Sequence, residues 1–195
     1  MKAHIFTHHG DRLDMGKGAL TYEMLRPNAR IGDTIACDRK GLMSWGIKIF
    51  TLSKYNHTAV IYVSDDHDAV WVAEMLQGKG LLWTPASDWV RDKLNRGIKL
   101  RYCFRPTGTN DEESMTEFMI KSRASHLKYG WNSLLKILAG QVLRLRYNTS
   151  SLVCSTFAQS IHEVGGYQGY AVLADPDDIQ EHSQITFKIK KAKND

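Results

Sequence analysis

The stretch HTAVIYVSDDHDAVWVAEM, residues 57–75, carries the clearest information on the fold of this chain. Residues 57–63 and 69–75 are rich in β-branched and aromatic side chains, which favour strands. The polar run SDDHD, residues 64–68, separates the two segments and is typical of a turn. The sequence therefore predicts a β-hairpin here.

Further strands and helices are expected on both sides of this hairpin. Strands are predicted at 32–37 after the Gly32-Asp33 turn, 78–83, 98–104 and 185–189. Helices are predicted at 21–25 (ended by Pro27), 42–52, 88–94 (capped by Ser87), 111–127, 131–145 and 154–164. Strands come first, then helices, then a strand, and this order favours an α+β fold over a doubly wound α/β fold.

Length and composition are those of one ordinary globular domain. The chain has 195 residues, of which 43% are hydrophobic and 24% charged, which excludes a disordered or fibrous protein. We expect a single domain over 1–195, with an N-terminal extension at 1–31 and a basic tail at 190–195. No apolar run reaches the roughly 18 residues of a membrane span.

The N-terminal stretch MKAHIFTHHGD has no apolar core followed by a small-residue cleavage site, so no signal peptide is expected. The expected location is therefore the cytoplasm. Action at the cell envelope would require delivery by lysis, a phage particle or a secretion system. The net charge of +5 is mild, and no basic stripe interleaved with aromatic residues predicts nucleic-acid binding.

Cysteine is the residue type that points most directly to chemistry. Cys37, Cys103 and Cys154 are odd in number and widely spaced, so they predict neither a disulfide framework nor a metal clip. Cys154 opens a predicted helix, CSTFAQSIHEV, that ends at Gly165-Gly166. A thiol there faces unpaired backbone N–H groups and the positive end of the helix dipole, which favour the nucleophilic thiolate. The alternative is a small buried side chain without a chemical role.

A cysteine nucleophile needs a base, and His57 at the start of its predicted strand is the best candidate. If the hairpin turn is centred near Asp66, Glu74 lies opposite about Ala59. Glu74 would then be a diagonal neighbour of His57 on the same face and could orient its imidazole. A shift of one residue in register would separate them. The other histidines are weaker candidates: His8 and His9 lie in an ill-defined stretch, His67 in a turn, and His126, His162 and His182 at expected surface positions.

Several short segments together resemble a known family. They are Gly32-Asp33 before an apolar strand, TLSKYNH (51–57), Trp83-Thr84-Pro85, Tyr129-Gly130-Trp131, VCSTF (153–157) and Pro176-Asp177-Asp178. They are similar to segments of NlpC-type, papain-like cysteine peptidases. Because the histidine precedes the cysteine in the chain, the match is to the circularly permuted YiiX/YaeF-like branch, which is related to the lecithin:retinol acyltransferase group.

The resemblance implies a papain-like antiparallel sheet or half-barrel packed against helices. It also implies a cysteine hydrolase in which His57 activates Cys154, an acyl-enzyme forms, and no metal or organic cofactor takes part. The expected substrates are amides or peptides, with peptidoglycan peptides a candidate. Tyr55 is the expected second donor to the oxyanion, beside the N–H of Cys154. The oligomeric state is left open.

Three other functions remain alternatives. A lipid acyltransferase or thioesterase could use the same fold and the same cysteine. A non-catalytic binding module would keep the cleft without turnover. A metal hydrolase is suggested by FTHHGDRLD (6–14), which carries a histidine–aspartate cluster but lacks the alternating histidines of metallo-β-lactamase-like enzymes.

Overall fold

The structure is a computed structural model that describes residues 5–6, 12–13, 21–38, 54–64, 69–125, 127, 153–170, 174–183 and 186–191. The strands in these ranges are β1 (Ile5–Phe6), β2 (Arg12–Leu13), β3 (Thr34–Asp38), β4 (His57–Val63), β5 (Val70–Leu76), β6 (Gly80–Pro85), β7 (Lys99–Cys103) and β8 (Thr186–Ile189). The helices are α1 (Tyr22–Leu25), the short 3₁₀ helix η1 (Arg26–Asn28), α3 (Ala86–Asn95), α4 (Glu112–Ala124), α6 (Cys154–Val164) and α7 (Pro176–Glu181).

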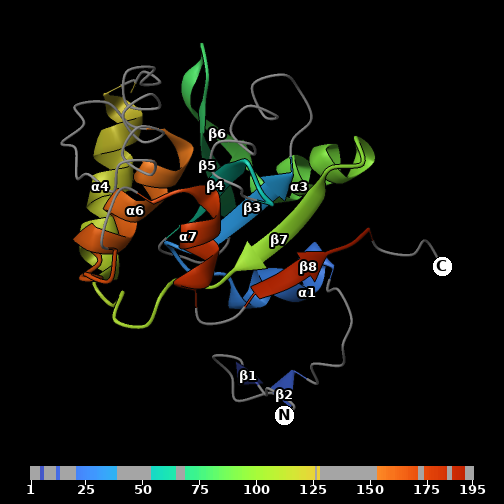
Figure 1. Cartoon of the computed structure of the whole chain (residues 1–195), viewed down its shortest axis with the longest axis horizontal. Helices are drawn as coiled ribbons and strands as arrows, with labels where there is room; N and C mark the ends of the chain where they lie inside the picture. Colours follow the sequence, from blue (N-terminus) through green and yellow to red (C-terminus); the bar gives the residue numbers. More distant parts are fainter. Residues whose placement is uncertain are drawn as a thin grey trace.

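Six of the strands form one antiparallel sheet in the order β6-β5-β4-β3-β7-β8, and β1 pairs with β2 alone. Helices pack against this sheet on both faces (Figure 1). The α+β class and the antiparallel sheet are therefore confirmed. The predicted hairpin is confirmed too: Val60 pairs with Ala73, and Val63 with Val70.

Most predicted element boundaries lie within two residues of the observed ones, and helices α3 and α4 differ most. Helix α3 begins at Ala86, so Ser87 lies inside the helix and the prediction that it caps the helix is wrong. Pro85 precedes the helix instead, because a proline has no N–H to leave unpaired at a helix start. Helix α4 ends at Ala124, three residues early, and begins after Asp111, whose side chain accepts a hydrogen bond from the Ser114 N–H.

One face of the sheet packs against α1 and α3 (Figure 1). Alternate residues of β4, such as Ala59 and Ile61, point to this side, as the period-2 geometry of a strand requires. Tyr22 and Leu25 of α1 and Trp89 of α3 cover them. The segment at 21–28, within the expected N-terminal extension, thus contributes to the core.

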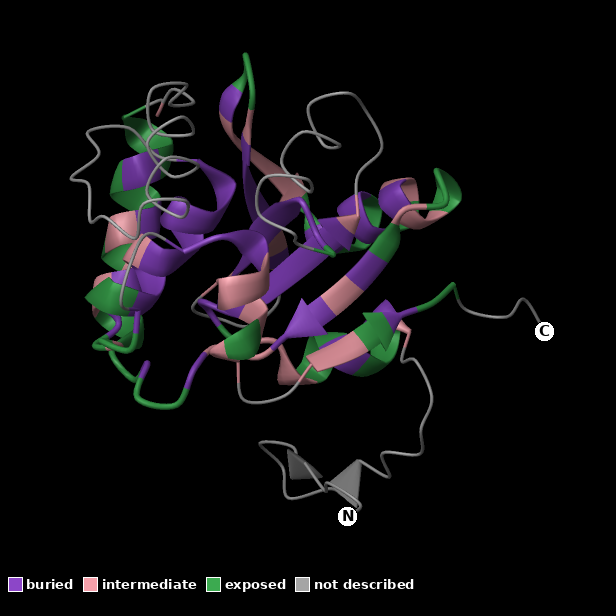
Figure 2. Ribbon diagram, viewed as in Figure 1, coloured by how far each residue is buried: buried purple, intermediate pink, exposed green. Residues whose placement is uncertain are grey.

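The opposite face packs against α4, α6 and α7. Val60 of β4 and Ala73 of β5 belong to one buried apolar cluster with Phe157 and Ile161 of α6, and all four are fully or almost fully buried. Figure 2 shows that the central strands and most of α6 consist of buried residues, whereas α4 carries exposed residues along its length. Helix α6 is therefore enclosed between the sheet and two other helices.

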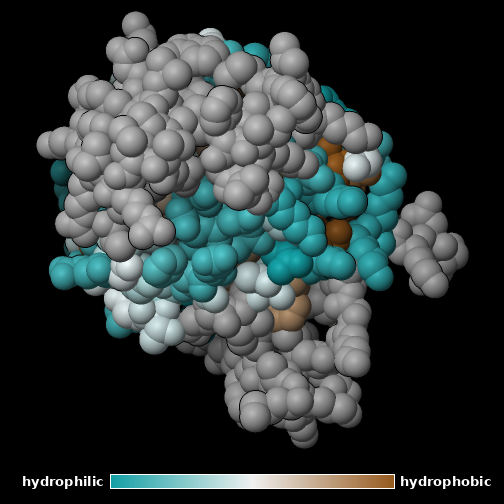
Figure 3. Space-filling view, in the orientation of Figure 1, coloured by the Kyte–Doolittle hydropathy of each residue, from teal (hydrophilic) through white to brown (hydrophobic). Residues whose placement is uncertain are grey.

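Some expectations fall on residues outside the described ranges. These are the predicted helices at 42–52 and 131–145 and most of the turn at 64–68. Within the described residues, no helix is long and apolar enough to cross a membrane. Figure 3 shows that most of the described surface on this face is hydrophilic, with only small apolar spots.

Candidate functional site: a buried thiol, imidazole and carboxylate

Cys154 is the first residue of α6, as the sequence predicts. The chain enters the helix in an extended conformation at Val153, whose N–H donates to the hydroxyl of Thr156 at 2.9 Å. This bond closes the first turn and holds the cysteine at the positive end of the helix dipole. Cys154 is only 6% exposed and packs in the apolar layer with Phe157 and Ala158.

His57 is the first residue of β4, and its side chain hydrogen-bonds to the sulfur of Cys154. The observed register, continued by one pair beyond Val60–Ala73, sets Glu74 opposite Ala59, which is the predicted arrangement. The Nε2 atom of His57 lies 2.9 Å from Oε2 of Glu74. Since Nε2 is engaged with the carboxylate, Nδ1 is the ring nitrogen left for the sulfur of Cys154. The structure thus places the three side chains in one chain of contacts.

Electrostatics in this cluster favour a charged pair. Burial by itself disfavours the thiolate, but the positive charge of His57 and its hydrogen bond lower the pKa of Cys154 below its ordinary value. The backbone N–H groups of Thr58 and Ser155 also donate to the sulfur and lower this pKa further. Burial likewise disfavours the imidazolium, but the charges and hydrogen bonds of Cys154 and Glu74 outweigh it and raise the pKa of His57. A thiolate and an imidazolium therefore stabilise each other here.

Glu74 is 3% exposed, yet it stays ionised. Burial by itself would raise its pKa, but the hydrogen bond and charge of His57, and then the charge of Lys93, lower it to about 2. Lys93 projects from α3, with Nζ 3.6 Å from Oε1 of Glu74. Sequence reasoning missed Lys93, although a lysine three residues after the buried pair Trp89 and Val90 on one helix face was a usable signal.

Tyr55, the expected second oxyanion donor, is buried and contacts other strands. Its hydroxyl accepts a hydrogen bond from Nε of Arg101 at 3.2 Å, and its ring packs with Ala36 and Cys103. Arg101 belongs to β7, which is two strands from β4 in the sheet. These contacts hold the hydroxyl towards β7 and support a structural role for Tyr55.

Two histidines expected at the surface are partly or fully buried, and for His162 the prediction is wrong. His162 has no exposed surface: Nδ1 accepts a hydrogen bond from the Tyr170 hydroxyl, and Nε2 donates to the carbonyl of Gly32, each at 2.7 Å. Its burial follows from the enclosure of α6 between the sheet and other helices. His182 is half-buried and contacts the Tyr167 hydroxyl. His126 lies outside the described residues.

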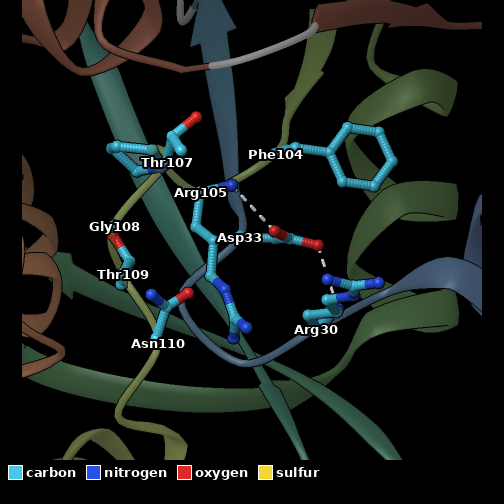
Figure 4. A pocket seen from close by; sticks show the side chains of 9 residues that line it. Arg30, Asp33, Phe104, Arg105, Thr107, Gly108, Thr109 and Asn110 are labelled. Atoms are coloured by element: carbon cyan, nitrogen blue, oxygen red, sulfur yellow. Dashed lines mark hydrogen bonds between the residues drawn. The ribbon is translucent and has the colours of Figure 1, made fainter.

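The Gly32-Asp33 turn proves to be a structural junction. Asp33 is fully buried and accepts hydrogen bonds from the Tyr102 hydroxyl and from the backbone N–H groups of Arg30 and Arg105, at 2.7, 2.9 and 2.9 Å. Figure 4 shows the two backbone bonds at the wall of a small polar pocket. This pocket lies where β3 begins, whereas His57 pairs with Cys37 near the other end of β3. It is therefore separate from the thiol cluster.

Among the residues that the structure describes, no group of three or more histidine, cysteine and acidic side chains is arranged to hold a metal ion. Most of the segment 6–14 lies outside those residues. In comparisons with known proteins, no family model matches the chain and no curated protein sequence matches it. The geometry of the cluster is therefore the basis for a functional proposal.

Proposed function

We propose that this protein is a cysteine-dependent hydrolase that acts through an acyl-enzyme on Cys154. One observation carries the proposal: a thiol at the start of a helix is hydrogen-bonded to His57, and His57 is hydrogen-bonded to the ionised Glu74 at 2.9 Å. A nucleophile, a base and a group that orients the base are the parts that covalent acyl transfer requires.

The steps follow from this order of contacts. The thiol proton of Cys154 resides on His57, and the thiolate attacks an amide or ester carbonyl to form the C–S bond. The carbonyl oxygen becomes an oxyanion, which the N–H of Cys154 and the start of α6 stabilise. His57 then donates its proton to the leaving nitrogen or oxygen as that bond breaks.

Water completes the cycle. His57 accepts a proton from the water molecule that attacks the thioester, and the acid product leaves with Cys154 restored as the thiolate. Glu74 stays ionised throughout and keeps the imidazole in one orientation, since its pKa of about 2 is far below that of the groups that exchange protons. The chemistry needs no metal ion or organic cofactor.

The resemblance to circularly permuted, papain-like NlpC-type enzymes supports this proposal. The expected nucleophile lies on a helix that packs against an antiparallel sheet, and the expected base lies on a strand earlier in the chain. We propose amides as the first substrate class, and peptidoglycan peptides as the first substrates to test. Acyl esters and thioesters form the second panel because the same thiolate would attack them.

The decisive experiment is alkylation by iodoacetamide at graded pH, with peptide mapping of each cysteine. We expect Cys154 to react well below pH 8, although an ordinary thiol has a pKa of about 8.5. Cys37 and Cys103 are internal controls: both are fully buried, and burial raises the pKa of Cys103 to about 12.

Two histidine variants complete the experiment. His57→Ala should move the alkylation of Cys154 to the pH range of an ordinary thiol, because the positive partner is lost. His182→Ala, which removes a half-buried histidine that contacts Tyr167 instead, should leave it unchanged. Wild-type Cys154 that behaves as an ordinary thiol would contradict the proposal and favour a binding module. An activated thiol that cleaves esters and no amides would favour the lipid acyltransferase or thioesterase alternative.

A further inference from the structure

Lys93 lies on the core-facing side of α3, where the spacing of buried residues would normally place an apolar side chain. The buried residues of α3 are Ala86, Trp89, Val90 and Lys93, a spacing of three and four that defines the core-facing side of the helix. Lys93 is only 6% exposed. An ammonium group loses its hydration there and is retained only beside an anion.

That anion is Glu74, which Lys93 shares with His57. The Nζ of Lys93 lies 3.6 Å from Oε1 of Glu74, and Nε2 of His57 lies 2.9 Å from Oε2. Lys93 also lies 5.0 Å from the centre of the Trp89 ring, a cation–π distance, and 3.8 Å from Oδ2 of the half-exposed Asp92. The two oxygens of one carboxylate therefore bind two different cations.

We propose that Lys93 is a positioning residue of the thiol site, which holds Glu74 in place and limits how strongly that carboxylate stabilises protonated His57. This inference deepens the proposed function, because it explains how the base can release its proton at all. A buried imidazolium between a thiolate and an uncompensated carboxylate would hold its proton tightly. Lys93 offsets part of that negative charge and so weakens the hold of the site on the proton of His57.

The charged and titratable groups around the cluster come from each element packed against it. His57 lies on β4, the Cys37 thiol faces it from β3, and Cys154 faces it from α6. From α3 come Lys93 and, behind it, Asp92. Strand β6, the other neighbour of β5, carries no charged residue. Among the residues that the structure describes, Lys93 is therefore the cation that balances Glu74 on the side away from His57.

The sign of its effect follows from charge alone. Replacing Lys93 by a neutral residue makes the site more negative, so the imidazolium holds its proton to higher pH. Nζ of Lys93 and Nε2 of His57 lie 3.6 and 2.9 Å from the two oxygens of one carboxylate. Charges this close to a shared partner, in a medium with an effective dielectric constant of about 20, interact strongly enough to move a titration by about one pH unit. Cys154 lies beyond His57 in the chain of contacts, so its own proton loss should move less.

The test is the titration of His57 by NMR in a Cys154→Ser background, which reads the imidazole directly and does not depend on hydrolysis. We expect Lys93→Met to raise the titration midpoint of His57 by about one pH unit. Lys93→Gln removes the same charge but keeps a polar side chain, so it should raise the midpoint by a similar amount. It serves as the test variant if Lys93→Met folds poorly. Lys93→Arg keeps the charge and should keep the wild-type midpoint.

Lys121→Met is the matched control, because Lys121 is exposed on α4 and pairs with Glu117 instead. It should leave the midpoint of His57 unchanged. An unchanged midpoint in both neutral Lys93 variants, with or without a change in melting temperature, would overturn the inference and reduce Lys93 to a structural ion pair. An equal shift in Lys93→Arg would overturn it as well.

The same variants in the protein with its cysteine separate this inference from the proposed function. In Lys93→Met, the pH at which Cys154 becomes alkylated should move less than the titration midpoint of His57. If wild-type Cys154 behaves as an ordinary thiol while the midpoint of His57 still responds to Lys93, the hydrolase proposal fails and the role of Lys93 stands. If the thiol is activated and the midpoint of His57 does not respond to Lys93, the hydrolase proposal stands and the role of Lys93 fails.

Discussion

The carboxylate of Glu74 links the catalytic proposal to the rest of the molecule, because it contacts both His57 and Lys93. Burial of this side chain would normally favour its neutral form, yet its pKa falls to about 2 because a cation faces each oxygen. An amide in the same place would keep the shape and remove the charge. The charge of Glu74 can therefore be tested separately from its packing.

Glu74→Gln should lower kcat/KM by about 100-fold, which is within the usual range for losing the support of a general acid–base. The basic limb of the pH profile should move to lower pH, because the imidazolium loses its anion. This shift is opposite in sign to that expected for Lys93→Met. Glu163→Gln on α6 is the control, since Glu163 accepts a hydrogen bond from Gln159. A basic limb that stays in place would show that Glu74 does not act on His57.

At the scale of the element, the first turn of α6 both donates N–H groups to Cys154 and ties the preceding chain to the helix. The turn exposes N–H groups to the sulfur of Cys154, and Thr156 closes it through the N–H of Val153. The hydroxyl of Thr156 also donates to the Val153 carbonyl at 3.3 Å, so both polar groups of that residue are satisfied. A threonine at this position thus ties the chain before the nucleophile to the helix that carries it.

Thr156→Ala should lower the free energy of unfolding by about 1 to 2 kcal/mol, because it leaves a buried N–H without an acceptor. Thr156→Ser keeps the hydroxyl and should lose less than half as much. Urea unfolding of the three proteins measures both values. An equal loss in the two variants would mean that the methyl group, rather than the hydrogen bond, holds the turn.

At the scale of the whole molecule, His162 joins α6 to the turn before β3. Burial lowers the pKa of His162 to about 4, even though its bond to the Gly32 carbonyl acts in the opposite direction. The neutral ring is the form that fits, because protonation would turn Nδ1 from an acceptor into a second donor facing the Tyr170 hydroxyl. The junction between helix layer and sheet therefore weakens in acid.

The contribution of His162 to the free energy of unfolding falls as the pH falls. An unfolded histidine has a pKa of about 6.5, so the unfolded state binds more protons than the folded state between about pH 6.5 and 4. The contribution of His162 is complete above that range and falls by up to about 3 kcal/mol across it. His162→Gln offers one acceptor and one donor without titrating. Its free energy of unfolding should fall less steeply with acid than that of the wild type, and identical slopes would contradict the assignment.

Local sequence patterns were sufficient to predict the central hairpin and the cysteine helix. The alternation of residues and the short polar turn set the register that brings Glu74 to His57, because side chains opposite one another in a hairpin share a face. The apolar stripe and the two glycines bounded α6 correctly. These features depend on neighbours in the chain, and local geometry is enough to determine them.

The contacts of Cys154, His162 and Lys93 were decided by the tertiary structure. Cys154 meets His57 only because α6 packs across β4, and no local rule brings together residues so far apart in the chain. His162 is buried because α6 has neighbours on both sides, which removes the solvent-facing side that a polar residue normally occupies. Lys93 is buried because its counter-charge comes from another element, β5. The sequence alone thus determines the residues and local elements of the site, and packing determines which of their charges meet away from water, where electrostatic interactions are strongest.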